Sequence, residues 1–597
     1  MREEKVFYDL GKVFLPSDAI SEQGKRDRWR AVPYRCGERN GTFLASLGDG
    51  RPADVSFCPE LTGWYKIYVS VPAYENTELN LKLTKDEGFW KYSPTRTHRL
   101  SFVLMEESLW RCCDMTGQSI TISKNSMAPG MGRDSMLAWL RFVPMSDAEV
   151  EQLLAEQART DTKRLYATDD IHHGLYEDNI TSLSSWSGLV EQYKNSDVAW
   201  LSLEDISLFT GGKCPGDDPE NFGFSRLGDY LVQKQLETFN AQETLTHMVK
   251  KGHEMGLKMS ISLRMAAWGM NYPFDQSYFD CPFYKENPQY RCVGRDGAVA
   301  SSLSYGYEAV QQKVIDQLVL DVSTGCDAIT ILANRSAPFM LFEKPVADRF
   351  FAAYGEYPYE LPMDEPRLNS VYCQIMTEFF RKLRKALDEA SPDKHIEIHL
   401  RTMYSLYDSK YVGLDCELLA KEKLVDLFIS YPLRYREILR DSFLCDGKVD
   451  LEKYVEHIYS DDPDAFYYQR SGDFDSIEPY ANSRGELVGP ADLETNVQQW
   501  LDLEKHYGTP VHFEIFPRVV APETFRKKAE RLYKAGAQSL ALWDTYGRVP
   551  FNALWSVMRK AGHKDAILNP GEPEFRYYRV HEHAGEDMTR ILLLWGG

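Results

Sequence analysis

Eight short apolar segments, each ending in polar or aromatic residues, recur along most of the chain. Most are separated by stretches with helical periodicity, as expected of strands that alternate with helices. They read RLYATDDIHHG from Arg164, VAWLSLEDIS from Val198, KMSISLRMAAWG from Lys258, CDAITILANRS from Cys326, HIEIHLRTMYS from His395, VDLFISYPLRY from Val425, VHFEIFPRV from Val511 and SLALWDTYGR from Ser539. Alternating β and α units predict a parallel sheet, and eight units close most naturally into a (β/α)8 barrel.

The first part of the chain follows another pattern. Segments such as GWYKIYVSVPAY and ELNLKLTK alternate apolar and polar residues between turn residues, which is typical of antiparallel strands with one buried face. We therefore predict an α/β fold in which an N-terminal antiparallel β-sandwich precedes the barrel. The predicted domains are the sandwich over residues 1–146, a linker helix over 147–163, the barrel over 164–565, and C-terminal strands over 566–597 that pack on either domain. A carbohydrate-binding role for the sandwich stays open.

Composition limits the classes of binding partner and the cellular compartment that the chain suits. The formal net charge of −20 disfavours nucleic acid and anionic membranes, because both draw affinity from clustered Lys and Arg. The N-terminus lacks a basic start with an apolar stretch, and no apolar run reaches the roughly 18 residues of a membrane span. We expect a cytoplasmic protein with reduced cysteines, since the eleven cysteines show no metal or disulfide spacing. A homo-oligomer stays open.

The polar residues at the strand ends are the candidate site, because barrel enzymes draw their catalytic residues from these ends. Glu514 lies among apolar neighbours, which raise a carboxyl pKa unless a cation pairs with it. A structural alternative is a glutamate buried against Arg401 or Arg518. Trp543 and Asp544 combine an aromatic ring with a carboxylate, which suits the apolar faces and hydroxyls of a sugar.

Further strand ends supply candidate binding groups. Glu204 and Asp205 point to opposite sides of their strand, so at most one of them faces the pocket. Hydrogen-bond donors at the ends of the third, fifth and sixth strands could bind the hydroxyl, carboxylate or sulfate groups of a substrate. Salt bridges between these donors and the acidic residues at the other strand ends explain their presence equally well. The candidate donors are Arg264, His399, Arg401, Tyr431 and Arg434.

The first strand end, with Asp169, Asp170, His172 and His173, leaves a metal site open. Amidohydrolase-type sites need an H-x-H strand motif and further histidines, which are missing apart from His399. We therefore expect no metal, and count Asp170 and His172 as substrate-binding candidates. Dinucleotide, P-loop and serine-hydrolase motifs are also missing, so no cofactor is expected.

The stretch from Glu286 to Gly355 resembles bacterial family-ten-like glycosyl hydrolases. The matching features are Asn287-Pro288 with an aromatic residue two positions on, Leu303-Ser304-Tyr305 before a helix, Asn334-Arg335 after the fourth strand, Phe342-Glu343-Lys344-Pro345, and Tyr354-Gly355. The resemblance implies a (β/α)8 barrel, often behind an N-terminal β-sandwich, and a carbohydrate substrate.

Retaining barrel glycosidases of the largest clan place an acid/base at strand four and a nucleophile at strand seven. Glu514 matches the nucleophile by position. At strand four this chain departs from better-known relatives, because Leu332 stands where they carry a carboxylate. The nearest carboxylate is Glu343, which must fold back over the pocket.

Glycosidase chemistry needs two carboxyl groups, about 5 to 5.5 Å apart for retention and roughly 6.5 to 9.5 Å apart for inversion. The expected pair is Glu514 with Glu343, and Asp544 or Glu204 replaces Glu343 if it lies too far away. Asn334 and Arg335 would then orient hydroxyls. We predict an exo-acting glycoside hydrolase for small oligosaccharides or glycosides. The alternatives are a catalytically silent carbohydrate-binding barrel and a metal-dependent hydrolase or lyase.

Overall fold

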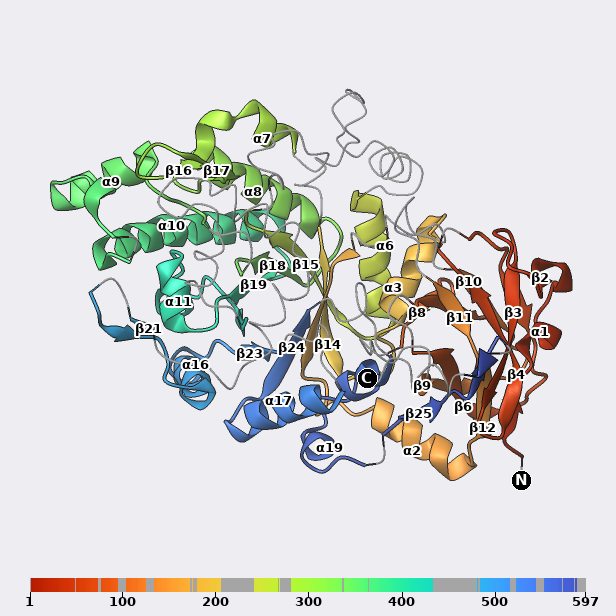
Figure 1. The fold of residues 1–597 in the computed structure, drawn as a ribbon. Helices are drawn as coiled ribbons and strands as arrows, with labels where there is room; N and C mark the ends of the chain where they lie inside the picture. Colours follow the sequence, from red (N-terminus) through yellow and green to blue (C-terminus); the bar gives the residue numbers. More distant parts are fainter. Residues whose placement is uncertain are drawn as a thin grey trace.

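The structure is a computed structural model of the 597-residue chain. It describes residues 2–48, 50–73, 77–94, 104–124, 134–171, 174, 180–205, 241–266, 268, 281–334, 338–362, 364–432, 480–481, 484–515, 522–543, 552–571, 573–584 and 586–587. Figure 1 shows the N-terminal sheets and the barrel as neighbouring parts of one molecule, with α2 running along the lower side of their junction.

Eight parallel strands form a closed barrel in chain order, with the last strand paired to the first. This confirms the predicted fold class. The strands are β13 (Leu165–Asp169), β14 (Val198–Glu204), β15 (Lys258–Arg264), β18 (Ala328–Leu332), β19 (Glu397–Thr402), β20 (Leu427–Ser430), β23 (Val511–Glu514) and β24 (Ser539–Trp543).

Helices cover the outside of the barrel. The longer ones are α6 (Ala241–Glu254), α8 (Glu308–Val322), α9 (Lys344–Tyr354), α10 (Pro366–Ala390), α16 (Leu493–Tyr507) and α17 (Pro522–Lys534). The shorter ones are α3 (Ser187–Glu191), α7 (Pro282–Glu286), α11 (Leu406–Tyr411), α12 (Cys416–Lys421), α18 (Asn552–Met558) and α19 (Lys564–Leu568). Helix α16 ends at Gly508 in the left-handed region, with φ of 75°, where glycine carries no Cβ penalty. No helix among the described residues is long and apolar enough to cross a bilayer.

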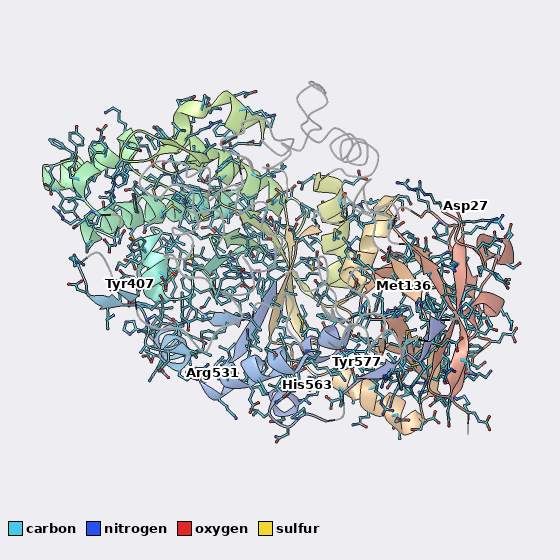
Figure 2. All side chains as sticks on the ribbon, viewed as in Figure 1. Asp27, Met136, Tyr407, Arg531, His563 and Tyr577 are labelled. Atoms are coloured by element: carbon cyan, nitrogen blue, oxygen red, sulfur yellow. The ribbon has the colours of Figure 1, made fainter. Side chains whose placement is uncertain are left out.

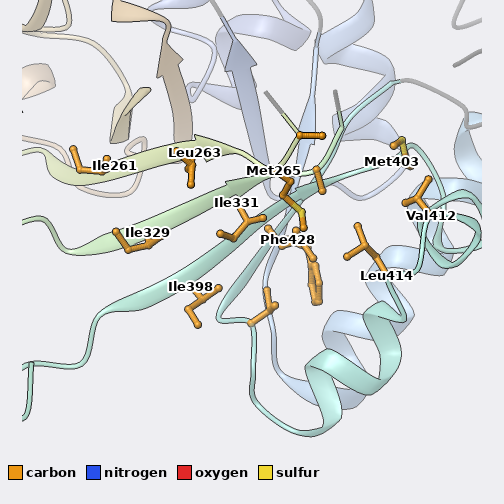
Figure 3. Close-up of a cluster of buried hydrophobic side chains, with 14 of the residues drawn as sticks. Ile261, Leu263, Met265, Ile329, Ile331, Ile398, Met403, Val412, Leu414 and Phe428 are labelled. Atoms are coloured by element: carbon orange, nitrogen blue, oxygen red, sulfur yellow. The ribbon is translucent and has the colours of Figure 1, made fainter. Parts of the chain in front are cut away.

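The alternation of side chains along each strand decides which of them meet the helices. Ile261 and Leu263 of β15, Ile329 and Ile331 of β18, and Ile398 of β19 belong to one buried hydrophobic cluster (Figure 3). Their neighbours in sequence point into the barrel, because successive side chains of a strand face opposite sides. The interior therefore receives the residues that alternate with this aliphatic set.

Antiparallel sheets form the N-terminal part, which we call the N-terminal β domain. Two of its sheets, β1-β12-β6-β9-β25 and β5-β10-β7-β8, contribute to one hydrophobic cluster, and a further sheet contains β11-β4-β3-β26-β27 with β2 beside β3. The strands are β1 (Lys5–Phe7), β2 (Ile20–Ser21), β3 (Trp29–Cys36), β4 (Arg39–Ser46), β5 (Val55–Phe57), β6 (Trp64–Pro72), β7 (Leu79–Leu83), β8 (Trp90–Tyr92), β9 (Leu104–Asp114), β10 (Ile120–Lys124), β11 (Ser135–Leu137) and β12 (Trp139–Pro144). A short helix, α1 (Leu10–Val13), follows β1.

The C-terminal strands join this β domain. Strand β25 (Phe575–Arg579) pairs with β9, and β26 (Glu582–His583) pairs with β3 and with β27 (Glu586–Asp587). The sequence did not predict whether these C-terminal strands pack on the β domain or on the barrel. Helix α2 (Asp147–Gln157) leads from β12 towards the barrel, and Ser146 and Glu149 form a capping box at its start. Two small hairpins, β16 (Arg291–Val293) with β17 (Val299–Leu303) and β21 (Tyr480–Ala481) with β22 (Leu487–Val488), lie outside these sheets.

Candidate active site

The mouth of the barrel gathers charged and aromatic side chains from several strands. Glu204, at the end of β14, lies within ion-pair distance of Arg264, at the end of β15. Its Oε1 is 2.6 Å from Arg264 Nε, and its Oε2 accepts a hydrogen bond of 2.9 Å from Arg264 Nη2. Asp170, just after β13, accepts a further bond of 3.0 Å from Nη2. The first three strands are therefore tied together by one guanidinium.

A second arginine pairs with Glu514. Arg401 Nε of β19 is 3.1 Å from Glu514 Oε2 of β23, and neither side chain is exposed. Arg401 Nη2 also donates to Thr168 Oγ1 of β13 at 2.8 Å. Strands β13 and β19 are four strands apart in the closed order, so Arg401 crosses the barrel. The arginine pairing that sequence offered as the structural alternative for Glu514 is thus present.

Trp543, at the end of β24, lies between the two arginines. The guanidinium carbon of Arg401 is 4.7 Å from the centroid of the indole ring, and that of Arg264 is 5.9 Å away. Tyr431, which follows β20, meets the same ring at a centroid distance of 5.7 Å and an angle of 66°. Leu332 of β18 completes this small cluster. Both aromatic rings expected at the mouth are therefore in contact.

Asn334 follows β18 and is fully buried. Neither its amide nitrogen nor its amide oxygen has a hydrogen-bond partner among the described residues. A buried amide without partners costs about 1–3 kcal/mol, so such a group calls for a ligand or an ordered water. It lies at the strand where the family comparison expects an acid.

His399 lies one layer deeper than the mouth. It precedes Arg401 by two residues, and its ring nitrogens hydrogen-bond with Glu397 Oε2 at 2.9 Å and Tyr166 Oη at 3.0 Å. The carboxylate of Glu397 is engaged by this bond, which lowers its pKa although burial acts in the opposite direction. With both nitrogens engaged inside the barrel, His399 supports the layer above it.

The same interior layer contains hydroxyl groups that our sequence analysis did not single out. Tyr166 Oη lies 2.6 Å from Thr330 Oγ1, which also contacts Ser260 Oγ. His512 packs edge-on to Tyr166 at 5.9 Å, and burial lowers its pKa to about 3, with His399 and Arg401 adding to the effect. The sequence could have indicated that Tyr166 points into the barrel, because successive side chains of a strand face opposite sides and Tyr166 therefore shares one face of β13 with Thr168 and Asp170.

Glu343 belongs to a different cluster. Its Oε1 accepts hydrogen bonds from the Ser304 hydroxyl and from Leu341 N–H at 3.1 Å, and its Oε2 accepts bonds from Leu341 N–H at 3.0 Å and Val293 N–H at 3.2 Å. These partners belong to the β16–β17 region and to the segment before α9. Burial raises the pKa of Glu343, while these hydrogen bonds oppose the shift. Glu343 fastens this segment, and its hydrogen-bond partners Ser304, Leu341 and Val293 do not belong to the mouth.

Several other predicted residues lie elsewhere. Asp205 follows Glu204 directly; burial raises the pKa of Asp321 of α8, and the charge of Asp205 adds to that effect. Asp544, Arg335, Arg434 and His172 lie outside the described residues, as does His173. Among the residues that are described, no group of three or more His, Cys, Asp or Glu could hold a metal ion. The metal alternative therefore stays untested.

Comparisons with known proteins yield likeness of fold alone. No family model matches the chain, and no curated protein matches it. The resemblance to family-ten-like glycosyl hydrolases therefore remains a prediction.

The solved structures to which the chain is similar include the PgaB (BpsB) glycoside hydrolase domain from Bordetella bronchiseptica, at 12% identity over 66% of this chain and 98% of that one, with a TM-score of 0.38. The catalytic domain of β-amylase from Paenibacillus polymyxa matches at 10% identity over 69% and 99%, with a TM-score of 0.37. An α-galactosidase from Thermus thermophilus matches at 11% identity over 94% and 100%, with a TM-score of 0.31. At these scores the likeness carries no argument about activity.

Proposed function

We propose that the mouth of the barrel is the active site of a glycoside hydrolase. The observation that supports this best is the pair of carboxylates, Glu204 and Glu514, each held by an arginine that lies against the Trp543 ring. Hydrolysis of a glycosidic bond needs two carboxyl groups on either side of that bond. An indole ring offers an apolar face to the C–H groups of a sugar.

Glu514 and Glu204 are the catalytic pair in this proposal. Sequence favoured Glu343 as the partner of Glu514, but both Glu343 oxygens are engaged by Ser304, Leu341 and Val293. Strands β23 and β14 are separated by β24 and β13, and these carry Trp543 and Asp170 at their ends. Asp544, next to Trp543, remains the second candidate for the partner.

The remaining mouth residues bind and orient the substrate in this proposal. Asn334 offers an amide donor and acceptor that are both free of partners among the described residues. Arg264 and Arg401 fix the two carboxylates, and Tyr431 holds the Trp543 ring. Exo action on small oligosaccharides or glycosides is part of this proposal.

A catalytically silent carbohydrate-binding barrel is the second candidate. Leu332, the last residue of β18, replaces the expected acid at strand four. An arginine beside a carboxylate favours its ionised form, whereas a general acid must hold a proton. The mouth would then still bind sugar through Trp543 and Asn334.

The proposal is tested by activity on aryl glycosides and small oligosaccharides, followed by variants of the carboxylates. On the substrate that the wild type cleaves, Glu514→Gln and Glu204→Gln should each lower kcat about 100-fold or more, because each removes a group that transfers a proton or attacks the sugar. Glu343→Gln is the matched control, and its folded fraction should keep kcat within about tenfold of wild type.

Because Glu514 is buried against Arg401, loss of activity alone does not separate chemistry from folding. Azide added to Glu514→Ala should restore turnover and yield a glycosyl azide, which a purely structural role would not produce. Turnover within about tenfold of wild type in both mouth variants contradicts the assignment. Sugar binding without any turnover by the wild type favours the silent barrel.

A further inference from the structure

A cavity of about 1100 Å³ lies between the N-terminal β domain and the barrel. Strands β6 and β9 line one side, α18 lines the other, and α2 and the start of β25 also contribute. Lys163 and Asp197, which lie within two residues of the starts of β13 and β14, belong to the lining. The cavity thus adjoins the end of the barrel opposite the mouth, and among the described residues its lining includes no member of the mouth.

The cavity and its surroundings can be located in the figures. In Figure 1, α2 and β25 lie at the junction of the two parts of the molecule. In Figure 2, His563 and Tyr577 are labelled in this region. His563 lines the cavity, whereas Tyr577 does not.

The charged groups in the lining are largely matched by opposite charges. Within the β domain, Arg111 pairs with Asp86 at 2.8 Å, and Lys66 of the same domain pairs with Glu149 of the adjoining helix α2 at 2.9 Å. On the barrel side, Arg559 pairs with Glu574 at 2.6 Å and Lys251 pairs with Glu191 at 3.0 Å, and His563 Nδ1 lies within hydrogen-bond distance of Asp197 Oδ2 at 2.7 Å. Paired charges present donors and acceptors side by side with little net field. Such a lining favours a neutral, polar ligand over an ion.

Aromatic rings enter from both sides. Trp64 and Tyr68 line the cavity from β6, and Trp555 lines it from α18. The Tyr68 ring is covered by Arg141, whose guanidinium carbon is 3.9 Å from its centroid. Trp64 is half-buried at the beginning of β6, so it is the ring best placed to meet a ligand. Aromatic faces combined with hydrogen-bonding groups suit a sugar.

Two amide side chains between the β domain and the barrel each have one polar atom without a hydrogen-bond partner among the described residues. Gln192 Oε1 accepts from Lys91 N–H at 3.1 Å, and Asn552 N–H donates to Ser93 O at 2.9 Å, so both residues tie the barrel to the β domain. Among the described residues, Gln192 Nε2 and Asn552 Oδ1 have no partner. Both residues line the cavity, and an amide of this kind can pair with a hydroxyl group.

We propose that this cavity is a second binding site, and that it takes a neutral oligosaccharide. Its volume exceeds the roughly 300–1000 Å³ of sites for small ligands, which leaves room for several sugar rings. Ion pairing of most of these charges leaves little net field to hold an ion, and the many charged side chains of the lining disfavour a lipid chain. The site is independent of the catalytic pair, because it lies at the other end of the barrel.

The test is calorimetric titration of the full chain carrying Glu514→Gln with maltohexaose, cellohexaose, xylohexaose and mannohexaose. At least one of these should bind. In that background, Trp64→Ala should weaken binding about tenfold or more, by loss of the stacking surface, and Trp64→Phe should keep most of it. Tyr577→Ala is the matched control, because Tyr577 is an exposed ring on β25 (40% exposed) outside the lining, and it should leave binding unchanged.

The outcomes separate this site from the proposed active site. Binding that Trp64→Ala weakens, together with no turnover of any tested glycoside by the wild-type protein, supports the cavity while the glycosidase proposal fails. Binding that Trp543→Ala abolishes and Trp64→Ala leaves unchanged overturns the cavity site and leaves the glycosidase proposal standing. Absence of binding by all four hexasaccharides also overturns it.

Discussion

At the scale of single residues, three buried glutamates differ in what holds them. Glu204 and Glu514 each face a guanidinium at the mouth, whereas Glu343 accepts hydrogen bonds from a hydroxyl and backbone N–H groups. The arginines hold Glu204 and Glu514 near the Trp543 ring, whereas the hydrogen bonds of Glu343 fix the segment before α9. Burial is common to all three, so only the partners distinguish a candidate catalytic group from a structural one.

Glu343→Gln should therefore act on stability. Replacing one carboxylate oxygen with an NH₂ group leaves backbone donors without an acceptor, which costs about 1–3 kcal/mol of unfolding free energy at about pH 5. Burial raises the pKa of Glu343, so its contribution to stability is present at low pH and is lost as the pH rises through the raised pKa. The stability gap between wild type and variant should thus narrow from pH 4 to pH 8 in urea unfolding. A gap that widens with pH contradicts this account.

At the scale of elements, the alternation of side chains along each strand and the caps of the helices are local properties. Ser260 and Ser262 of β15 alternate with Ile261 and Leu263, and only the latter pair belongs to the hydrophobic cluster outside the barrel. Helix α2 begins with a capping box, in which Ser146 Oγ accepts from Glu149 N–H at 3.3 Å and Glu149 Oε2 accepts from Ser146 N–H at 2.9 Å. Such features depend on residues close together in sequence, which supply the hydrogen bonds of the cap and the alternation of side chains along the strand.

Ser146→Ala should loosen the first turn of α2. Loss of the cap costs about 1 kcal/mol, which corresponds to about fivefold faster hydrogen exchange at the Glu149 amide when exchange follows local opening. Exchange measured by mass spectrometry or NMR tests this. Ser146→Asn retains a side-chain acceptor and should keep the slow rate. Equal rates in wild type and Ser146→Ala would contradict the role of the cap.

At the scale of the whole molecule, the C-terminal strands return to the N-terminal sheets. Strand β25 extends the β1-β12-β6-β9 sheet, and Glu574, just before it, pairs with Arg559 and Lys560 beyond α18, each at 2.6 Å. Burial opposes ionisation of Glu574, but these cations outweigh it and lower its pKa to about 2. The chain after the barrel therefore clamps the two parts together.

Glu574→Gln should weaken this clamp at neutral pH, by about 2 kcal/mol, because a partly buried ion pair loses one partner. A lowered carboxyl pKa stabilises the fold above the unfolded value of 4.5 and loses that contribution as the pH falls towards about 2. Thermal unfolding should thus show a deficit of the variant at pH 7 that shrinks at pH 3. Glu389→Gln, on an exposed carboxylate 3.8 Å from Lys385, is the control and should leave the midpoint unchanged at both pH values. A deficit independent of pH would contradict the clamp.

The candidate site could be predicted only in part. The period of two and the apolar segments indicated which residues lie at the strand ends, and the structure places Glu204, Arg264, Arg401, Tyr431, Glu514 and Trp543 there. The Arg401–Glu514 pairing was offered only as one alternative, and the contact of Arg401 with Thr168 was not predicted, because these residues are 233 positions apart in sequence. Such a contact depends on the closure of the barrel, which no local pattern encodes.

By itself, the sequence determined the alternation of strands and helices, the antiparallel character of the N-terminal part and the cap of α2, because each follows from residues close together in the chain. Only the tertiary structure decided that Glu343 fastens a segment outside the mouth, that His399 lies below the site, and that the C-terminal strands join the β domain. These outcomes depend on which distant groups satisfy a buried charge or an open sheet edge. These partners come together only when the chain packs, because a buried polar group is stabilised by hydrogen-bonding groups that can lie far away in sequence.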